Sequence, residues 1–146
     1  MPGLSVLLVE DDPAVRYANA QTLKLAGFDV IACASAEAAL EKVHPLFPGV
    51  MLVDVRLPGM DGLALLERVQ RMESSLPVII ITGHGDVAMA VQAMRAGAYD
   101  FLEKPTPSEL LVNAARRALE RRQLTFEMAD LRRQLQQKDG IERILI

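Results

Sequence analysis

Five short apolar runs alternate with stretches of helical length, and this alternation is the feature that most limits how the chain can fold. The runs are rich in valine, isoleucine and leucine, and this composition is typical of strands buried on both faces. Five strand–helix units in a row predict an α/β fold in which a parallel sheet carries helices on both faces. The predicted strands are residues 4–9, 29–33, 50–53, 78–81 and 99–102.

Residues that begin and end helices stand between these runs. Asp12 precedes Pro13, which puts a side-chain acceptor before a first-turn proline. We therefore interpret Asp12 as a helix cap in preference to a metal ligand. A capping box with proline at its second position, residues 106–109, begins the last helix. Other candidate N-caps are Ser35, Asp61 and Asp86, and candidate C-terminal glycines are Gly27 and Gly97.

Length and charge exclude several classes of function. A chain of 146 residues is expected to form one domain with a short appendage. The net charge of -3 argues against a grip on nucleic acid by this piece, because phosphate contacts need a basic surface. Cys33 is the single cysteine, so an internal disulfide and a zinc site of paired thiolates are excluded. No apolar stretch reaches membrane-spanning length and no signal peptide is apparent, so we expect a cytoplasmic protein without membrane contact.

The last segment differs from the rest. A helical pattern runs from Pro107 to about Lys138, with Gly140 as the expected stop. Its second half is strongly charged and carries apolar residues at spacings of four, three and four, which is typical of a coiled-coil seam. We expect this seam to join two copies of the chain, because an isolated helix is marginal in water. The prediction is a folded domain of residues 1–122 and a helical linker of residues 123–146, with a seam of Leu124, Met128, Leu131 and Leu135.

Polar residues follow four of the predicted strands at the point where each strand ends. Glu10 and Asp11 follow the first strand, Asp54 the third, Thr82 the fourth and Lys104 the fifth. Ligands of an open parallel sheet bind at the carboxyl ends of its strands, where the strand order reverses. In a flavodoxin-like order 2-1-3-4-5, the first and third strands are neighbours at that point. The fold would therefore gather these side chains on one rim.

This inventory suits phosphoryl transfer. Clustered carboxylates repel one another unless a cation intervenes, and Mg²⁺ takes oxygen ligands from one or two carboxylates. A carboxylate can attack phosphorus, while a metal ion, a lysine and a hydroxyl neutralise or bind the transferred group. No Ser-His pair is placed for acyl transfer. Each residue alone also has a plain interpretation, as a solvated strand end, a turn residue or a surface lysine.

Four motifs, in this order and spacing, resemble the receiver domains of bacterial two-component response regulators. The resemblance covers the chain from Leu4 to about Arg122. It implies a (βα)₅ fold with sheet order 2-1-3-4-5. The motifs are LLVEDD at residues 7–12, MLVDVRLPGMDG at 51–62, VIIITGHGD at 78–86 and GAYDFLEKP at 97–105.

The resemblance also implies roles for the residues of the rim. Asp54 would be the phosphoacceptor and Asp11 a direct Mg²⁺ ligand. The backbone carbonyl of Arg56 would be a further ligand, and Glu10 would act on the ion through water. Many members carry two aspartates where this chain has Glu10 and Asp11, and this departure leaves the direct ligand intact.

Further roles concern the bound phosphate. The resemblance implies that Thr82 and Lys104 bind it, that Thr82 and Phe101 form the conformational switch, and that Pro105 follows a cis peptide bond. Arg56 and His84 lie two residues past Asp54 and Thr82. They are expected to flank the water that hydrolyses the aspartyl phosphate and thereby to set its lifetime.

The segment TGHGDVAMAVQAM and the charged extension look like the receivers of AAA+ activators that act with the alternative sigma factor, of the C4-dicarboxylate-transport type. This resemblance implies a sensor histidine kinase as phosphate donor, a role in transcription regulation and an AAA+ output domain after this fragment. The domain is then a phosphoacceptor that catalyses only its own phosphorylation and dephosphorylation.

Two alternatives stay open at this point. One is a stand-alone receiver that relays phosphate, although such proteins usually end with the fifth helix. The other is a phosphatase of the haloacid dehalogenase type, which also uses an aspartate nucleophile with Mg²⁺. That class needs a second carboxylate two residues after the nucleophile, where this chain has Arg56.

Overall fold

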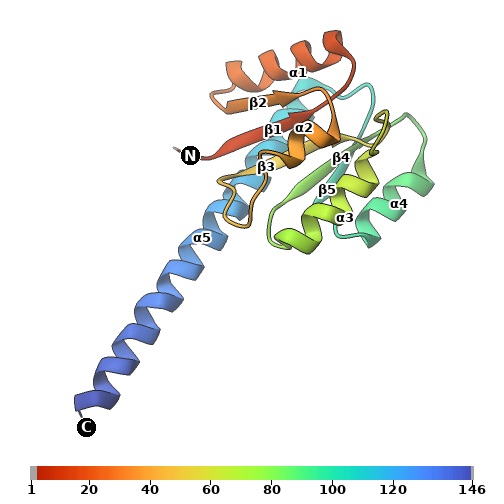
Figure 1. Cartoon of the computed structure of the whole chain (residues 1–146). Coiled ribbons are helices and arrows are strands. Elements are labelled where there is room, and N and C mark those ends of the chain that lie inside the picture. The colour runs from red at the N-terminus through yellow and green to blue at the C-terminus, as the bar shows by residue number, and fades with distance from the viewer. Residues whose placement is uncertain (1–2, 146) are drawn as a thin grey trace.

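The computed structural model describes the backbone of residues 3–145 and the side chains of residues 3–137. Five parallel strands form one sheet in the order β2-β1-β3-β4-β5, which confirms the predicted α/β fold (Figure 1). The strands are β1 (Ser5–Val9), β2 (Asp29–Cys33), β3 (Gly49–Asp54), β4 (Val78–Thr82) and β5 (Asp100–Glu103). The helices are α1 (Pro13–Leu25), α2 (Ala36–Leu40), α3 (Gly62–Met72), α4 (Val87–Arg95) and α5 (Ser108–Leu145).

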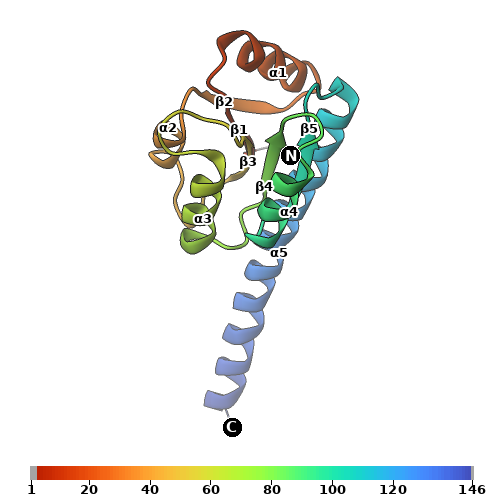
Figure 2. The same ribbon diagram turned by 90° about the vertical axis from the view of Figure 1, so that its right-hand side faces the viewer.

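Helices cover both faces of the sheet, and each face has its own apolar core (Figures 1 and 2). On one face, alternate strand residues such as Met51 and Val53 pack with side chains of α2, α3 and α4. On the other face, their neighbours Val50 and Leu52 pack with side chains of α1 and α5. Every residue of β3 and β4 is buried. The absence of polar alternation in these strands follows from this burial on both sides.

The expectation of burial on both faces is wrong for the two outer strands. Asp29 and Ala32 of β2 and Phe101 and Glu103 of β5 are exposed. Both strands have a neighbour on one side only. The apolar composition of a run does not distinguish an edge strand from a central one.

The helix signals are largely confirmed. The Asp12 carboxylate accepts from the backbone N–H groups of Ala14 and Val15, so it caps α1 as predicted. Ser35, Asp61 and Asp86 cap α2, α3 and α4 in the same way. Gly27 and Gly97 adopt positive φ angles of 96° and 106°, each directly after the C-cap residue of α1 or α4. The capping box is wrong by one residue, because the Thr106 hydroxyl donates to the Glu103 carbonyl and α5 begins at Ser108.

Helix α5 covers the sheet with its first half and then leaves the domain as a single extended helix (Figure 1). It continues through Gly140, so the predicted stop there is wrong. One glycine costs a helix only about 1 kcal/mol relative to alanine and does not end it alone. The predicted seam residues are each about half exposed in this single chain: Leu124 53%, Met128 45%, Leu131 51% and Leu135 53%.

Arg122 lies where α5 leaves the sheet, and it is fully buried. Its Nε and Nη2 atoms donate to the Phe47 carbonyl at 3.2 and 2.8 Å, and Nη1 donates to Ser75 Oγ at 3.0 Å. The guanidinium also stacks over the ring of Phe126, 4.4 Å from its centroid. Phe126 in turn packs against the core on that face, so contact with the domain extends past residue 122. Within residues 3–145, no helix is both long and apolar enough to cross a membrane.

Candidate functional site

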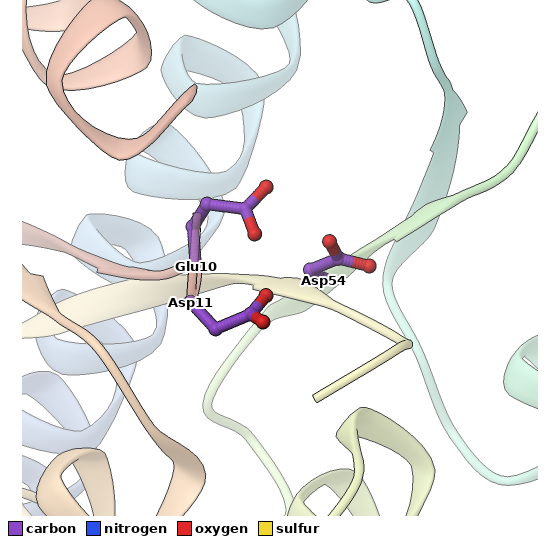
Figure 3. Close-up of side chains that lie close together, drawn as sticks. All are labelled: Glu10, Asp11 and Asp54. Carbon is purple, nitrogen blue, oxygen red and sulfur yellow. The ribbon is translucent and has the colours of Figure 1, made fainter. Parts of the chain in front are cut away.

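The neighbouring strands β1 and β3 bring three carboxylates together. The two strands run in parallel register, with Val9 opposite Val53, so the residues that follow them lie at the same rim of the sheet. Glu10, Asp11 and Asp54 each offer an oxygen atom there, and these atoms lie within 4.8 Å of one another (Figure 3). The structure thus places these three predicted residues side by side.

The three acids differ in exposure. Glu10 and Asp54 are 2% and 5% exposed, whereas Asp11 is open to solvent. Burial raises the pKa of Glu10, and the charge of Asp54 adds to this effect. Hydrogen bonds from Lys104 and from the backbone N–H of Asp12 oppose it. The buried acids therefore need a cation close by.

Lys104 supplies one cation. Its Nζ atom lies 3.1 Å from Glu10 Oε1 and 2.5 Å from Asp54 Oδ2. Burial by itself would lower the pKa of Lys104, but the hydrogen bonds to the two acids outweigh burial and raise it. The backbone N–H of Lys104 donates to the Thr82 carbonyl at 2.8 Å, and the peptide bond to Pro105 is cis as expected.

The backbone around Asp54 is held from two sides. Asp54 Oδ1 accepts from the backbone N–H of Arg56 at 2.9 Å. On the other side, α3 begins at Gly62, whose N–H donates to the Val55 carbonyl. A Cβ atom on Gly62 would lie 2.6 Å from the Asp54 carbonyl oxygen. The absence of a side chain at Gly62 lets α3 pack against this strand end, a role the sequence analysis did not assign.

Thr82 and Phe101 lie on the neighbouring strands β4 and β5. The Thr82 hydroxyl is buried and donates to the Leu102 carbonyl of β5 at 3.4 Å. The Phe101 side chain is 37% exposed and lines a shallow hollow beside Val91 and Met94 of α4. In this structure the two predicted switch residues therefore face β5 and the surface.

Arg56 and His84 also lie at this rim, with 76% and 88% of their side chains exposed. The Arg56 guanidinium reaches the N-cap of α4, with Nη2 3.5 Å from Asp86 Oδ2. His84 Nδ1 lies 3.9 Å from Glu103 Oε2, which also accepts from the backbone N–H of Gly85 at 3.0 Å. Each side chain thus lies close to a carboxylate of a neighbouring segment at this rim.

Arg16, which no sequence motif indicates, contacts the backbone of the loop that carries Glu10 and Asp11. The Nη1 atom of Arg16 in α1 donates to the carbonyls of Glu10 and Asp11 at 2.8 and 3.3 Å. No motif pointed to it, because the contact is made to backbone atoms.

The donor set fits a hard divalent cation. Three clustered carboxylates offer only oxygen atoms, and the exposed Asp11 leaves the cluster open to water. Mg²⁺ prefers one or two carboxylates and keeps several waters. The arrangement can hold such an ion beside a buried carboxylate and a lysine.

Comparison with known proteins gives an independent result. The family model described as "Response regulator receiver domain" matches residues 6–116. The C4-dicarboxylate transport transcriptional regulatory protein DctD of Rhizobium meliloti is 50% identical over 129 residues, which are 88% of this chain and 28% of that protein. DctD of Pseudomonas aeruginosa is 49% identical over 141 residues, which are 97% of this chain and 30% of that protein.

A solved structure agrees in fold. The receiver domain of NtrX from Brucella abortus superposes with a TM-score of 0.75 and 38% identity, covering 80% of this chain and 98% of that one. This chain spans less than a third of the length of the two DctD proteins.

Proposed function

The chain belongs to the response regulator receiver domain family, and on this premise we propose that Asp54 accepts a phosphoryl group from a sensor histidine kinase. The observation that carries the proposal is the position of its carboxylate. It is almost buried at the end of a central strand, and it faces two further acids and the ammonium of Lys104.

An oxygen of Asp54 forms the new bond to phosphorus as the bond from phosphorus to the kinase imidazole nitrogen breaks. The leaving imidazole keeps the electron pair and takes a proton from water. The Arg56 N–H holds Asp54 Oδ1, which orients the carboxylate. Lys104 now bridges Glu10 and Asp54, and it turns to a phosphate oxygen when the group arrives.

Asp11, Asp54 and the backbone carbonyl of Arg56 would hold Mg²⁺, and Glu10 would act through a water molecule. When bound, the ion neutralises charge on the transferring group. The raised pKa of Glu10 and the close packing of three acids support a cation here.

Thr82 and Phe101 then change position in response to the bound phosphate. The present hydrogen bond from Thr82 to the Leu102 carbonyl is long, at 3.4 Å, so a charged phosphate oxygen is a stronger acceptor. As Thr82 moves toward it, space opens for Phe101 to turn inward. The surface of α4, β5 and α5 changes with it.

In this proposal the receiver regulates transcription, and it does so as a homodimer. The relatives named above are transcriptional regulatory proteins, and by resemblance an AAA+ domain follows this receiver. The seam residues of α5 stand half exposed, and a second copy in parallel would cover them.

Incubation with acetyl phosphate and Mg²⁺, followed by intact mass measurement, tests the phosphoacceptor. The wild type gains one phosphoryl group and Asp54→Asn gains none. The matched control Asp29→Asn, at an exposed position on the edge strand, labels like the wild type. Equal labelling of Asp54→Asn would refute the assignment.

Sedimentation tests the dimer. Leu131→Asp places a charge in the seam and yields monomers at concentrations where the wild type is dimeric. Gln136→Asp is the control, since it adds the same charge outside the seam at an exposed position. A monomeric wild type at tens of micromolar would contradict the proposal.

A further inference from the structure

Arg16 lies where a cation is not expected. It is the fourth residue of α1, whose first turn has no acidic side chain. The amino end of a helix carries partial positive charge, so a guanidinium there is unfavourable. The structure shows what the side chain does instead: it is half-buried and directed back to the loop that carries the acids, where Nη1 donates to two carbonyls.

The two carbonyls belong to Glu10 and Asp11, which are two of the three clustered acids. One hydrogen bond is short, at 2.8 Å, and the other is 3.3 Å. The Glu10 side chain is buried and bonded to Lys104. Asp11 is exposed, so the direction of its carboxylate toward Asp54 depends on the backbone of this loop.

We propose that Arg16 is a positioning residue for the metal site, which holds the Glu10 and Asp11 peptides so that Asp11 faces Asp54. This inference rests on the proposed function, because it takes the acids as ligands of a divalent cation. Arg16 contacts no reacting atom and acts only through the loop.

Two effects of Arg16 on cation binding have opposite signs, and this makes the proposal testable. Its positive charge repels a divalent ion, so removing the charge alone tightens Mg²⁺ binding. Its hydrogen bonds orient the ligands, and loss of such outer contacts typically weakens metal binding about 10- to 100-fold. Weaker Mg²⁺ binding after removal of the side chain therefore indicates positioning, and tighter binding indicates an effect of charge alone.

The experiment is a MgCl₂ titration followed by amide chemical shifts, which requires no phosphorylation. Arg16→Met keeps the apolar stem and is expected to weaken Mg²⁺ binding about tenfold. Arg16→Lys keeps the charge without the planar guanidinium and is expected to bind Mg²⁺ more weakly than the wild type. The control Lys24→Met removes an exposed cation from the last turn of the same helix and is expected to bind like the wild type.

Phosphorylation by acetyl phosphate supplies a second measurement. The Arg16→Met variant needs more Mg²⁺ for half-maximal rate, yet approaches the wild-type rate at saturating Mg²⁺. A general defect of the fold would lower the maximal rate instead.

Mg²⁺ binding by Arg16→Met that equals or exceeds the wild type overturns the inference. If that variant does not fold, wild-type affinity in Arg16→Lys overturns it and weaker affinity supports it. A wild type that does not bind Mg²⁺ at all would refute the proposed metal site itself, which is a different outcome.

Discussion

Replacement of Arg122 by methionine is expected to destabilise the protein by about 2 to 5 kcal/mol. The hydrogen bonds from this charged donor to the buried Phe47 carbonyl contribute about 1.5 to 3 kcal/mol. Stacking on Phe126 adds about 0.5 to 2 kcal/mol. These hydrogen-bond contributions are already net of the cost of taking the guanidinium out of water. Burial lowers the pKa of Arg122, and the Glu73 carboxylate partly offsets this, but an arginine stays charged at neutral pH.

Urea unfolding followed by circular dichroism measures the effect, at a protein concentration where the chain is monomeric. Arg122→Ala is expected to cost about 2 kcal/mol more than Arg122→Met, because it also empties the space of the side-chain stem. The neighbouring Arg121 is exposed, so Arg121→Met stays within about 0.5 kcal/mol of the wild type. Equal midpoints of the urea transition for Arg122→Met and Arg121→Met, with unchanged slopes, would refute the conclusion that the contacts of Arg122 stabilise the fold.

Three further outcomes follow from the site. Saturating Mg²⁺ raises the unfolding free energy of the wild type, by about 2.7 kcal/mol at one hundred times the dissociation constant, and Asp11→Asn loses this gain; an unchanged gain would exclude Asp11 as a ligand. Gly62→Ala forces a methyl group against the strand end that carries the phosphoacceptor. It costs about 1 to 3 kcal/mol and slows phosphorylation, whereas Gly83→Ala, with open space around its Cβ, does neither. Replacing Arg56 and His84 together by alanine changes the rate of dephosphorylation and leaves Mg²⁺ affinity nearly unchanged; an unaltered rate removes both from the hydrolysis step.

The acidic cluster is predictable from the sequence because its cause is local and repeated. Each acid directly follows an apolar run, and the ends of neighbouring parallel strands must meet at one rim. The strand order then decides which ends are adjacent, and the observed pairing of β1 with β3 is the predicted one. The roles of these residues in chemistry remain predictions that rest on the family.

Contacts from side chains to distant backbone atoms are not predictable in this way. Arg122 stands in a charged stretch of a long helix, and a charged stretch is usually solvated. Its partners Phe47 and Ser75 lie 75 and 47 residues away. The sequence does not indicate which carbonyl oxygen accepts a hydrogen bond, because every residue has one. Arg16 was overlooked for the same reason.

Helices α3 and α5 both connect the acidic rim with Arg122, at the point where α5 leaves the sheet. Helix α3 begins at Gly62 against the backbone of Asp54, and the loop after it carries Ser75, which accepts from Arg122. Helix α5 follows the segment that begins with Lys104 and reaches Arg122 after four turns or so of helix.

The extension of α5 therefore does not leave the domain at a free hinge. Arg122 and Phe126 fix its direction to the loops at the amino ends of the strands. In a parallel dimer, the two seams meet only if the two domains are turned so that both extensions run side by side. Because Arg122 and Phe126 fix α5 to the domain, the orientation of the two receivers and the pairing of the seam residues would change together in such a dimer. In the proposed dimer, a shift of α3 or α5 at the acidic rim would act on the pairing of the seam through Arg122, without any change in the seam residues themselves.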